Sequence, residues 1–215
     1  AVAAHELPGA EPRMAHAAID TIADSIRARA PRLASMRSPD GTTNGPVESR
    51  LVEPLMAHLH TVFFDEQGYH GDTENYYNPL NSYLPAVMER RVGLPVTLTL
   101  LYKAVGERIG LRIDGIDAPG HFMAGVRTER NGEERVLLID PFDRGRLLTR
   151  DEALQRVETV TSRSVDDDNI ALASATHARW IERMLHNLLA VFRHENRERD
   201  AAAMLELRSL LTEDA

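Results

Sequence analysis

The sequence contains no cysteine, and only one of its 25 lysine and arginine residues, Lys103, is a lysine. Without thiols the chain forms no disulfide, no zinc–thiolate site and no iron–sulfur site. A thiolate nucleophile is excluded for the same reason. The preference for arginine over lysine indicates no binding function by itself. The absence of cysteine therefore removes whole classes of catalytic and metal site before any motif is considered.

Long apolar runs and blocks of one charge are also missing. No stretch approaches the about 18 consecutive apolar residues of a membrane-spanning helix, and residues 1–15 lack the basic and apolar regions of a secretory signal. The formal net charge is -8 at pH 7 without a cluster of basic residues, so the average surface repels phosphate groups. We therefore expect a cytoplasmic protein with no cofactor and with neither a nucleic-acid nor a membrane partner.

The length and the order of the sequence patterns indicate the fold class. A chain of 215 residues with 43% hydrophobic residues can bury the core of one ordinary domain. Its patterns follow in the order helices, sheet, helices, which indicates an α+β fold. We expect an N-terminal arm and helix over 1–46, a core over 47–160 and a helical hairpin over 170–215. The hairpin should dock on the core, because two helices alone cannot bury both of their faces. The expected contacts of the hairpin are Trp180, Leu185, Leu188 and Leu189.

Apolar spacing predicts helices in the first part of the chain. Residues 1–13 have no period and are interpreted as a loose arm, whereas residues 15–30 carry apolar side chains at helical spacing. Turn-forming residues over 38–46 predict a loop, and a second helical pattern begins at Val47. The polar and aromatic stretch 68–81 is expected to form an ordered loop over the core.

A central helix is predicted from Pro95 to Gly110. We expect Ser82 to cap a short helix that runs through Val92, and Gly93 to end it. Pro95 should begin the next helix, because a proline at the first helical position has no amide hydrogen to leave unpaired. This helix is the most apolar in the chain, so it should be central.

An alternating pattern after Gly110 predicts an antiparallel meander. The strands are expected at 111–116, 121–127 and 135–139, with a tight turn at Asn131-Gly132. Thr149 and Glu152 have the spacing of a capping box and predict a helix through Val157. The acidic stretch 166–168 is expected to be a solvated connection, and the hairpin helices should span 176–194 and 197–211.

His121 and Asp140 are predicted to lie close together, because one hairpin joins their strands. If the turn centres on Asn131-Gly132, Asp140 lies opposite Met123, and a loop centred one residue earlier puts it opposite His121. In both registers the two side chains leave the same face of the sheet, within about 8 Å. The pair is either the orienting half of a catalytic triad or a structural link between two strands.

The start of the Pro95 helix offers a place for a nucleophile. The first turn of a helix lies at the positive end of the helix dipole, and its amides can stabilise an oxyanion. Thr97 is the side chain there that could attack, with Thr99 two residues later. The alternative interpretation is that Thr97 is a tolerated polar residue with no chemical role.

Four ordered motifs resemble the second transglutaminase-core family, which includes bacterial SirB-one-type proteins and a domain beside an F-box in animal proteins. The resemblance covers roughly Glu48 to Leu154. The motifs span residues 75–84, 90–98, 119–122 and 139–142. The segment 183–188 also resembles the family's C-terminal helices, which often continue as tetratricopeptide-like repeats.

The resemblance implies a papain-like, transglutaminase-like fold whose superfamily uses a cysteine, a histidine and an aspartate. His121 matches the histidine and Asp140 the aspartate. The cysteine position falls within a residue or two of Thr97, and members of the family commonly carry a hydroxyl residue there. The residues expected to line the cleft are Asn75, Tyr76, Asn81, Tyr83, Pro119 and Phe142.

The missing thiol leaves three functional hypotheses. The first is a non-enzymatic regulatory or interaction module that keeps the cleft and binds another protein or a peptide. The second is an amide or ester hydrolase with Thr97 as nucleophile, His121 as base and Asp140 as orienter. The third is metal-assisted hydrolysis, which would use His121 with Asp140 or a loop containing the polar residues His70, Asp72 and Glu74. A threonine hydroxyl stays protonated near neutral pH and its methyl group crowds an approaching substrate, so we favour the first hypothesis.

Overall fold

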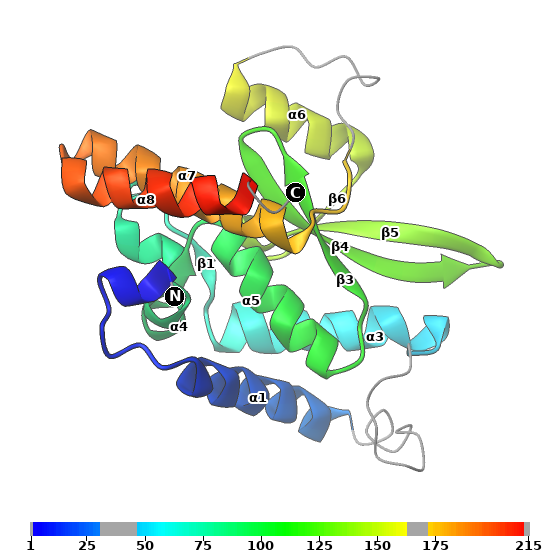
Figure 1. Cartoon of the computed structure of the whole chain (residues 1–215). Coiled ribbons are helices and arrows are strands. Elements are labelled where there is room, and N and C mark those ends of the chain that lie inside the picture. The colour runs from blue at the N-terminus through cyan, green and yellow to red at the C-terminus, as the bar shows by residue number, and fades with distance from the viewer. Residues whose placement is uncertain (1, 31–46, 163–171, 213–215) are drawn as a thin grey trace.

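The computed structural model describes residues 2–30, 47–162 and 172–212, and Figure 1 shows the arrangement of their elements. The helices are α1 (Pro12–Arg29), α3 (Ser49–His60), α4 (Leu84–Arg90), α5 (Pro95–Arg108), α6 (Arg150–Thr161), α7 (His177–His194) and α8 (Glu198–Thr212). The strands are β1 (His70–Gly71), β2 (Val92–Gly93), β3 (Ile113–Ala118), β4 (His121–Arg130), β5 (Glu133–Asp140) and β6 (Arg146–Leu148). Short 3-10 turns are η1 (Val2–His5), η3 (Pro79–Ser82) and η4 (Pro141–Asp143), and η2 (Thr61–Glu66) is a π-helical continuation of α3.

These elements confirm the α+β fold class. The predicted loop at 38–46 and the acidic stretch at 166–168 lie outside the described residues. No helix in the described ranges is long and apolar enough to cross a membrane. The cytoplasmic location and the domain boundaries stay predictions.

The sheet has the strand order β3-β4-β5-β6, with every neighbouring pair antiparallel. Asn131 and Gly132 both have positive φ, 57° and 80°, as a two-residue turn of type I′ requires. The turn sets the register in which Ala124 faces Ile139. Asp140 therefore continues opposite Met123, the first of the two predicted registers. β6, a short strand on the far side of β5, was not predicted.

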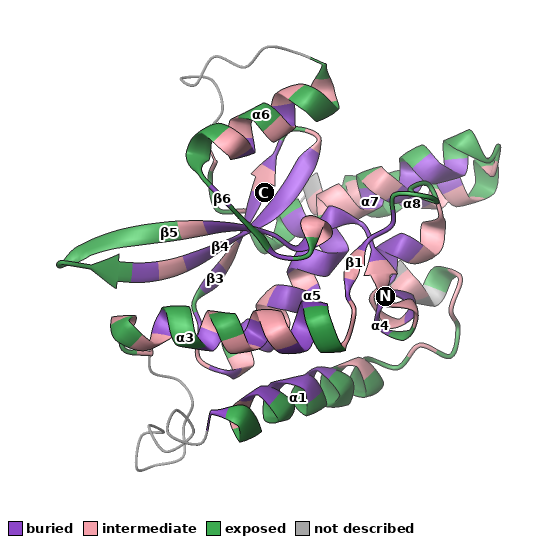
Figure 2. Cartoon of the chain, turned by 180° about the vertical axis from the view of Figure 1, so that it is seen from behind, coloured by how far each residue is buried: buried purple, intermediate pink, exposed green. Residues whose placement is uncertain are grey.

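Helix α5 lies in the centre of the molecule, as its composition predicted (Figure 1). Leu98, Leu101 and Val105 are fully buried and belong to a core that also includes residues of α1, α3 and the sheet. Figure 2 shows buried residues on the side of α1 that faces this core and exposed residues on its outer side. A Cβ atom at Gly106 would lie 2.3 Å from Ile113 Cδ1, so this glycine lets β3 approach the helix closely. Burial of apolar surface at about 25 cal/mol per Å² thus fixes α5 against the sheet.

The predicted cap and stop of the short helix before α5 were wrong. α4 begins at Leu84 after Tyr83, and Ser82 is buried with an Oγ that finds no partner among the described residues. The helix ends at Arg90, and its C-cap residue, Arg91, takes the left-handed conformation at φ 65°. Its guanidinium stacks over the Tyr69 ring at 4.9 Å, a contact that helps to hold this strained residue. Gly93 instead lies in β2, where a Cβ atom would come within 3.0 Å of both methyl groups of Val87.

Residues 2–7, predicted as a loose arm, lie against the C-terminal hairpin. His5 Nε2 is 2.7 Å from Asp200 Oδ1, and Glu6 forms an ion pair with Arg197. Leu7 packs beside the apolar cluster of the hairpin. The arm is ordered because it meets charged partners almost 200 residues away, which its local composition could not indicate.

The hairpin of α7 and α8 packs on the core through the four predicted residues, all of which are buried. The Trp180 ring lies 4.4 Å from the Phe122 ring. It fills the space above Gly115, where a Cβ atom would lie 2.1 Å from Trp180 Cζ2. Leu185, Leu188 and Leu189 join a second cluster that includes Tyr83 and Ala86 at the start of α4. The prediction that the hairpin uses these contacts is confirmed.

Candidate functional site

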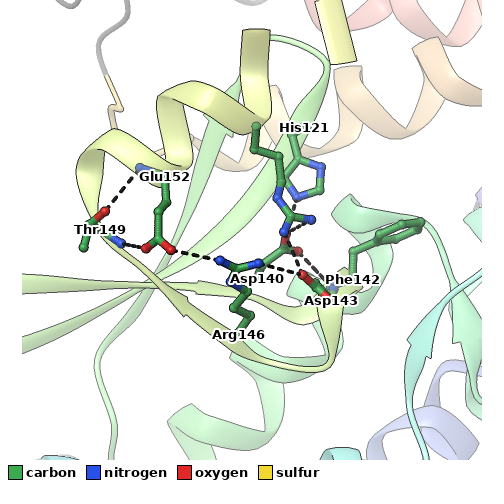
Figure 3. A network of polar contacts seen from close by, with 8 residues as sticks. His121, Asp140, Phe142, Asp143, Arg146, Thr149 and Glu152 are labelled. Carbon is green, nitrogen blue, oxygen red and sulfur yellow. Dashed lines mark hydrogen bonds and ion pairs between the residues drawn. The ribbon is translucent and has the colours of Figure 1, made fainter. Parts of the chain in front are cut away.

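His121 and Asp140 form a buried hydrogen bond at one end of the sheet. His121 is the first residue of β4 and Asp140 the last residue of β5. His121 Nε2 lies 2.8 Å from Asp140 Oδ2, and only 4% and 0% of the two residues are exposed. Figure 3 shows the imidazole pointing toward the carboxylate. The sequence register therefore placed this pair correctly on one face.

Both oxygens of Asp140 are filled by hydrogen-bond donors. Oδ1 accepts from the backbone amides of Phe142 at 3.0 Å and Asp143 at 3.3 Å, because Asp140 caps the 3-10 turn η4. Oδ2 lies 3.0 Å from Arg156 Nη1 in addition to His121 Nε2. Donors of this kind suit a carboxylate, which only accepts hydrogen bonds. The carboxylate is thus held rigidly by two backbone and two side-chain groups.

Arg156 is a site residue that the sequence did not reveal. It lies on α6 and bridges Asp140 and Asp143, with Nη2 2.7 Å from Asp143 Oδ2. The predicted capping box is present, since Thr149 Oγ1 accepts from the Glu152 amide and Glu152 accepts from the Thr149 amide. The capping box fixes the first residue of α6. The helical repeat from that point places Arg156 beside the carboxylates of Asp140 and Asp143. The capping box was the only local signal, because the partners of Arg156 belong to another element.

A cavity of about 560 Å³ opens beside the His121–Asp140 pair. α6 supplies mostly polar side chains to one wall, and the rest of the lining mixes apolar and aromatic side chains with Thr73, His121 and Arg146. The lining residues are Thr73, Tyr76, Pro95, Gly120, His121, Phe142, Arg146, Leu148, Glu152, Gln155, Arg156, Thr159 and Val160. The cavity therefore combines hydrogen-bonding groups with apolar surface, which is typical of sites for organic ligands.

Two of the predicted cleft residues, Tyr76 and Phe142, line this cavity. The Phe142 ring stands perpendicular to His121 at 6.2 Å, and Tyr76 packs on Phe142 at 6.1 Å. Burial raises the pKa of the Tyr76 hydroxyl, while the positive charge of Arg183 opposes that shift. Tyr76 therefore presents a protonated hydroxyl beside the aromatic wall at neutral pH.

The other predicted cleft residues are not among those lining the cavity. Asn81 is buried and donates to the Asn75 carbonyl at 2.8 Å, which ties down the preceding loop. Tyr83 lies in the cluster under α7, where burial and then Glu6 raise the pKa of its hydroxyl. Pro119 is exposed, and the next residue, Gly120, reaches the cavity instead.

Thr97 lies in the first turn of α5 but does not line the cavity. It is 0% exposed, and its Oγ1 has no hydrogen-bond partner in the described part of the chain, His121 included. Pro95, at the first position of the helix, faces the cavity instead. Thr99 is also buried and donates to the Phe122 carbonyl at 3.3 Å. The structure thus presents no hydroxyl of Thr97 to the imidazole.

The polar loop considered for a metal has other partners. Asp72 accepts from the Asn75 amide at 2.8 Å and lies 3.5 Å from Arg90. His70 belongs to β1, and its Nδ1 is buried without a partner among the described residues. Within those residues, no group of three or more His, Asp or Glu side chains is arranged to hold a metal ion.

A model of the transglutaminase-like superfamily matches residues 13–186, which include the His121–Asp140 pair and the first turn of α5. The chain belongs to the transglutaminase-like superfamily. It is a transglutaminase-like domain without a cysteine at any position. The family resemblance of the sequence motifs is therefore confirmed, together with the fold class.

Curated relatives include proteins of bacteria and animals. A UPF0162 protein of Xylella fastidiosa (strain 9a5c) is 37% identical over 156 residues, which make up 70% of this chain and 54% of that protein. The F-box only protein 21 of Mus musculus is 26% identical over 187 residues, 84% of this chain and 28% of that protein. The chain thus spans about half the length of the UPF0162 relative. No solved structure gives a significant match.

Proposed function

We propose that this transglutaminase-like domain is a non-enzymatic regulatory or interaction module that binds a peptide segment of another protein in the cavity. The observation that carries the proposal is the burial of Thr97, whose Oγ1 neither lines the cavity nor bonds to His121. A general base accelerates attack only when the nucleophile lies within hydrogen-bond reach. A cavity with an oriented imidazole that the Thr97 hydroxyl does not reach is better suited to binding than to acyl transfer by that residue.

The chemistry of the cavity wall supports a peptide ligand. Gln155 and Thr159 on α6 offer polar groups, and Tyr76, Phe142 and Leu148 offer apolar surface. A peptide carries both amide groups and side chains, so it can use both kinds of surface at once. Binding of a pre-ordered cavity to an extended segment is a recurring mode of protein recognition.

The alternative function is hydrolysis of an amide or ester with Thr97 as nucleophile, His121 as base and Asp140 as orienter. The observation in its favour is the 2.8 Å hydrogen bond that orients the imidazole through Nε2. The hypothesis requires α5 to expose the Thr97 hydroxyl beside His121 during turnover.

A single-thiol experiment separates the two functions, because the chain has no cysteine of its own. In the Thr97→Cys variant the new thiol should react with a maleimide only as fast as the domain opens, since the site is fully buried. Thr159→Cys is the matched control, because Thr159 lines the same cavity and is exposed. We expect rapid labelling of the control and slow labelling at position 97. Mass spectrometry measures both rates.

Equal labelling rates at the two positions would contradict the burial on which the proposal rests. An ester substrate such as p-nitrophenyl acetate gives the second test. Turnover by the unaltered protein that Thr97→Val and His121→Ala each abolish, with the fold intact, would establish the hydrolase instead.

A further inference from the structure

One oxygen of Asp140 serves both the imidazole and a guanidinium. His121 Nε2 and Arg156 Nη1 lie 2.8 and 3.0 Å from Oδ2, while Oδ1 accepts from two backbone amides. A carboxylate offers about four lone-pair positions. All of them are occupied by the four donors of this site.

The donors around Asp140 fix the position of one hydrogen. Arginine keeps its charge at any ordinary pH and only donates, and the backbone amides also only donate. The carboxylate therefore acts purely as an acceptor, so the hydrogen between Oδ2 and His121 belongs to Nε2. This assignment follows from the hydrogen-bond network, which is how histidine tautomers are inferred when hydrogens are not observed.

The protonation state of the other ring nitrogen follows from this assignment. In a neutral imidazole one nitrogen carries the hydrogen and the other accepts hydrogen bonds. With the hydrogen on Nε2, Nδ1 therefore keeps its lone pair. Arg156 holds the carboxylate that fixes this hydrogen and is anchored on its other side by Asp143. The imidazole also stands perpendicular to the Phe142 ring at 6.2 Å.

We propose that Arg156 is a positioning residue that holds His121 as the Nε2–H tautomer and so makes Nδ1 a hydrogen-bond acceptor for the ligand of the cavity. The ligand then has to donate an N–H or O–H group to Nδ1 and place apolar surface against Tyr76 and Phe142. This inference rests on the proposed binding function of the cavity. It assigns to α6 a direct part in ligand selection, through the side chain that contacts Asp140.

Nuclear magnetic resonance of protein labelled with 15N-histidine tests the tautomer. In the unaltered protein at neutral pH, Nε2 of His121 should be protonated and Nδ1 unprotonated. Arg156→Leu should lose this single pattern and give a mixture of the two tautomers, and Arg156→Lys should restore it. Arg127→Leu is the matched control, because Arg127 lies on the strand of His121 and pairs with Asp114 away from the cavity.

Two results would overturn the role of Arg156. One is a proton on Nδ1 in the unaltered protein. The other is an unchanged His121 pattern in Arg156→Leu whose circular dichroism shows an intact fold. If Arg156→Leu does not fold, Arg156→Gln replaces it, because glutamine keeps a hydrogen-bond donor but removes the charge. A His121 pattern in Arg156→Gln identical to that of the unaltered protein would overturn the role of the guanidinium.

Phenol and anisole test the donor requirement, because both carry an aromatic ring but only phenol donates a hydrogen bond. Binding is followed by shifts of the Gly120 and His121 signals. Phenol should bind about three- to tenfold more tightly than anisole, the factor that one net hydrogen bond contributes, and Arg156→Leu should reduce that ratio. Equal binding, or no binding of phenol, would overturn the acceptor role. Ester turnover with a preserved phenol preference would instead refute the proposed function and leave this inference standing.

Discussion

The His121–Asp140 pair and the first turn of α5 belong to the same buried region, but their polar atoms have opposite surroundings. Each oxygen of Asp140 accepts two hydrogen bonds. Thr97 Oγ1 is as deeply buried and has no partner among the described residues. A buried polar atom without a partner costs about 1–3 kcal/mol, whereas a satisfied network is held firmly.

The difference shows which of the candidate site residues have polar partners. His121 and Asp140 belong to a hydrogen-bond network that orients an imidazole. Thr97 is buried in an apolar helix, and its hydroxyl has no hydrogen-bond partner among the described residues. Three sets of substitutions would break or sharpen this contrast.

The largest effect is expected for Asp140→Ala, which removes the acceptor of four donors. Arg156 and His121 would be left without their shared partner, and loss of one member of a buried pair lowers the free energy of unfolding by about 3–5 kcal/mol. Asp143→Ala is the control, since the Asp143 side chain is 45% exposed and should cost about 1 kcal/mol or less. Urea unfolding followed by the fluorescence of Trp180, the single tryptophan, measures both. Equal losses of unfolding free energy would show that the buried network stabilises the fold no more than a partly exposed ion pair does.

Smaller effects on stability, opposite in sign to each other, are expected for the same substitution at the two threonines of α5. Thr97→Val removes an unpartnered hydroxyl and should raise the free energy of unfolding by about 1 kcal/mol. Thr99→Val is the same substitution two residues later, but it removes the hydrogen bond to the Phe122 carbonyl and should lower stability by about 1 kcal/mol. Urea unfolding compares them. If Thr97→Val is the more destabilising of the two, the hydroxyl of Thr97 has a partner, and the contrast fails.

The smallest effect concerns Glu152 on α6, one of the residues that line the cavity, and the dependence of stability on pH. The Thr149 backbone amide, and then Arg146, lower the pKa of Glu152 from its ordinary value of 4.5. A carboxylate whose folded-state pKa is depressed stabilises the fold above its unfolded pKa, and this contribution is lost as pH falls through the folded pKa. Glu152→Gln should therefore lose less stability than the unaltered protein when the pH falls below 4.5. Urea midpoints measured from pH 6 downward test this, and parallel curves for the two proteins would contradict it.

Several features of the site followed from local sequence signals. The Asn131-Gly132 turn fixes a hairpin register, and the alternation of strands then puts His121 and Asp140 on one face. Pro95 begins α5 and Thr149 caps the start of α6, as their residue types predict. These predictions succeeded because each depends on a turn or a helix end that a few neighbouring residues determine.

The features that the sequence did not reveal depend on distant contacts. Arg156 becomes a site residue only because α6 folds back over the end of β5. The sequence also did not show which side of α5 faces the cavity, because residues 95–99 are all buried. A helix with no exposed face in its first turn gives no indication of which side chain reaches the cavity. The motif resemblance predicted a nucleophile position within a residue or two of Thr97, and it gave no orientation for the side chain there.

The contact between Trp180 and Gly115 has a consequence for the size of the independent folding unit. The indole covers Gly115 of β3 and packs on Phe122, which follows His121 in β4. A fragment ending before α7 would expose the ring of Phe122 and leave a void the size of a tryptophan above the strand that carries the imidazole. We therefore expect a fragment that ends before α7 to be less stable than the longer chain, even though it contains every residue of the cavity.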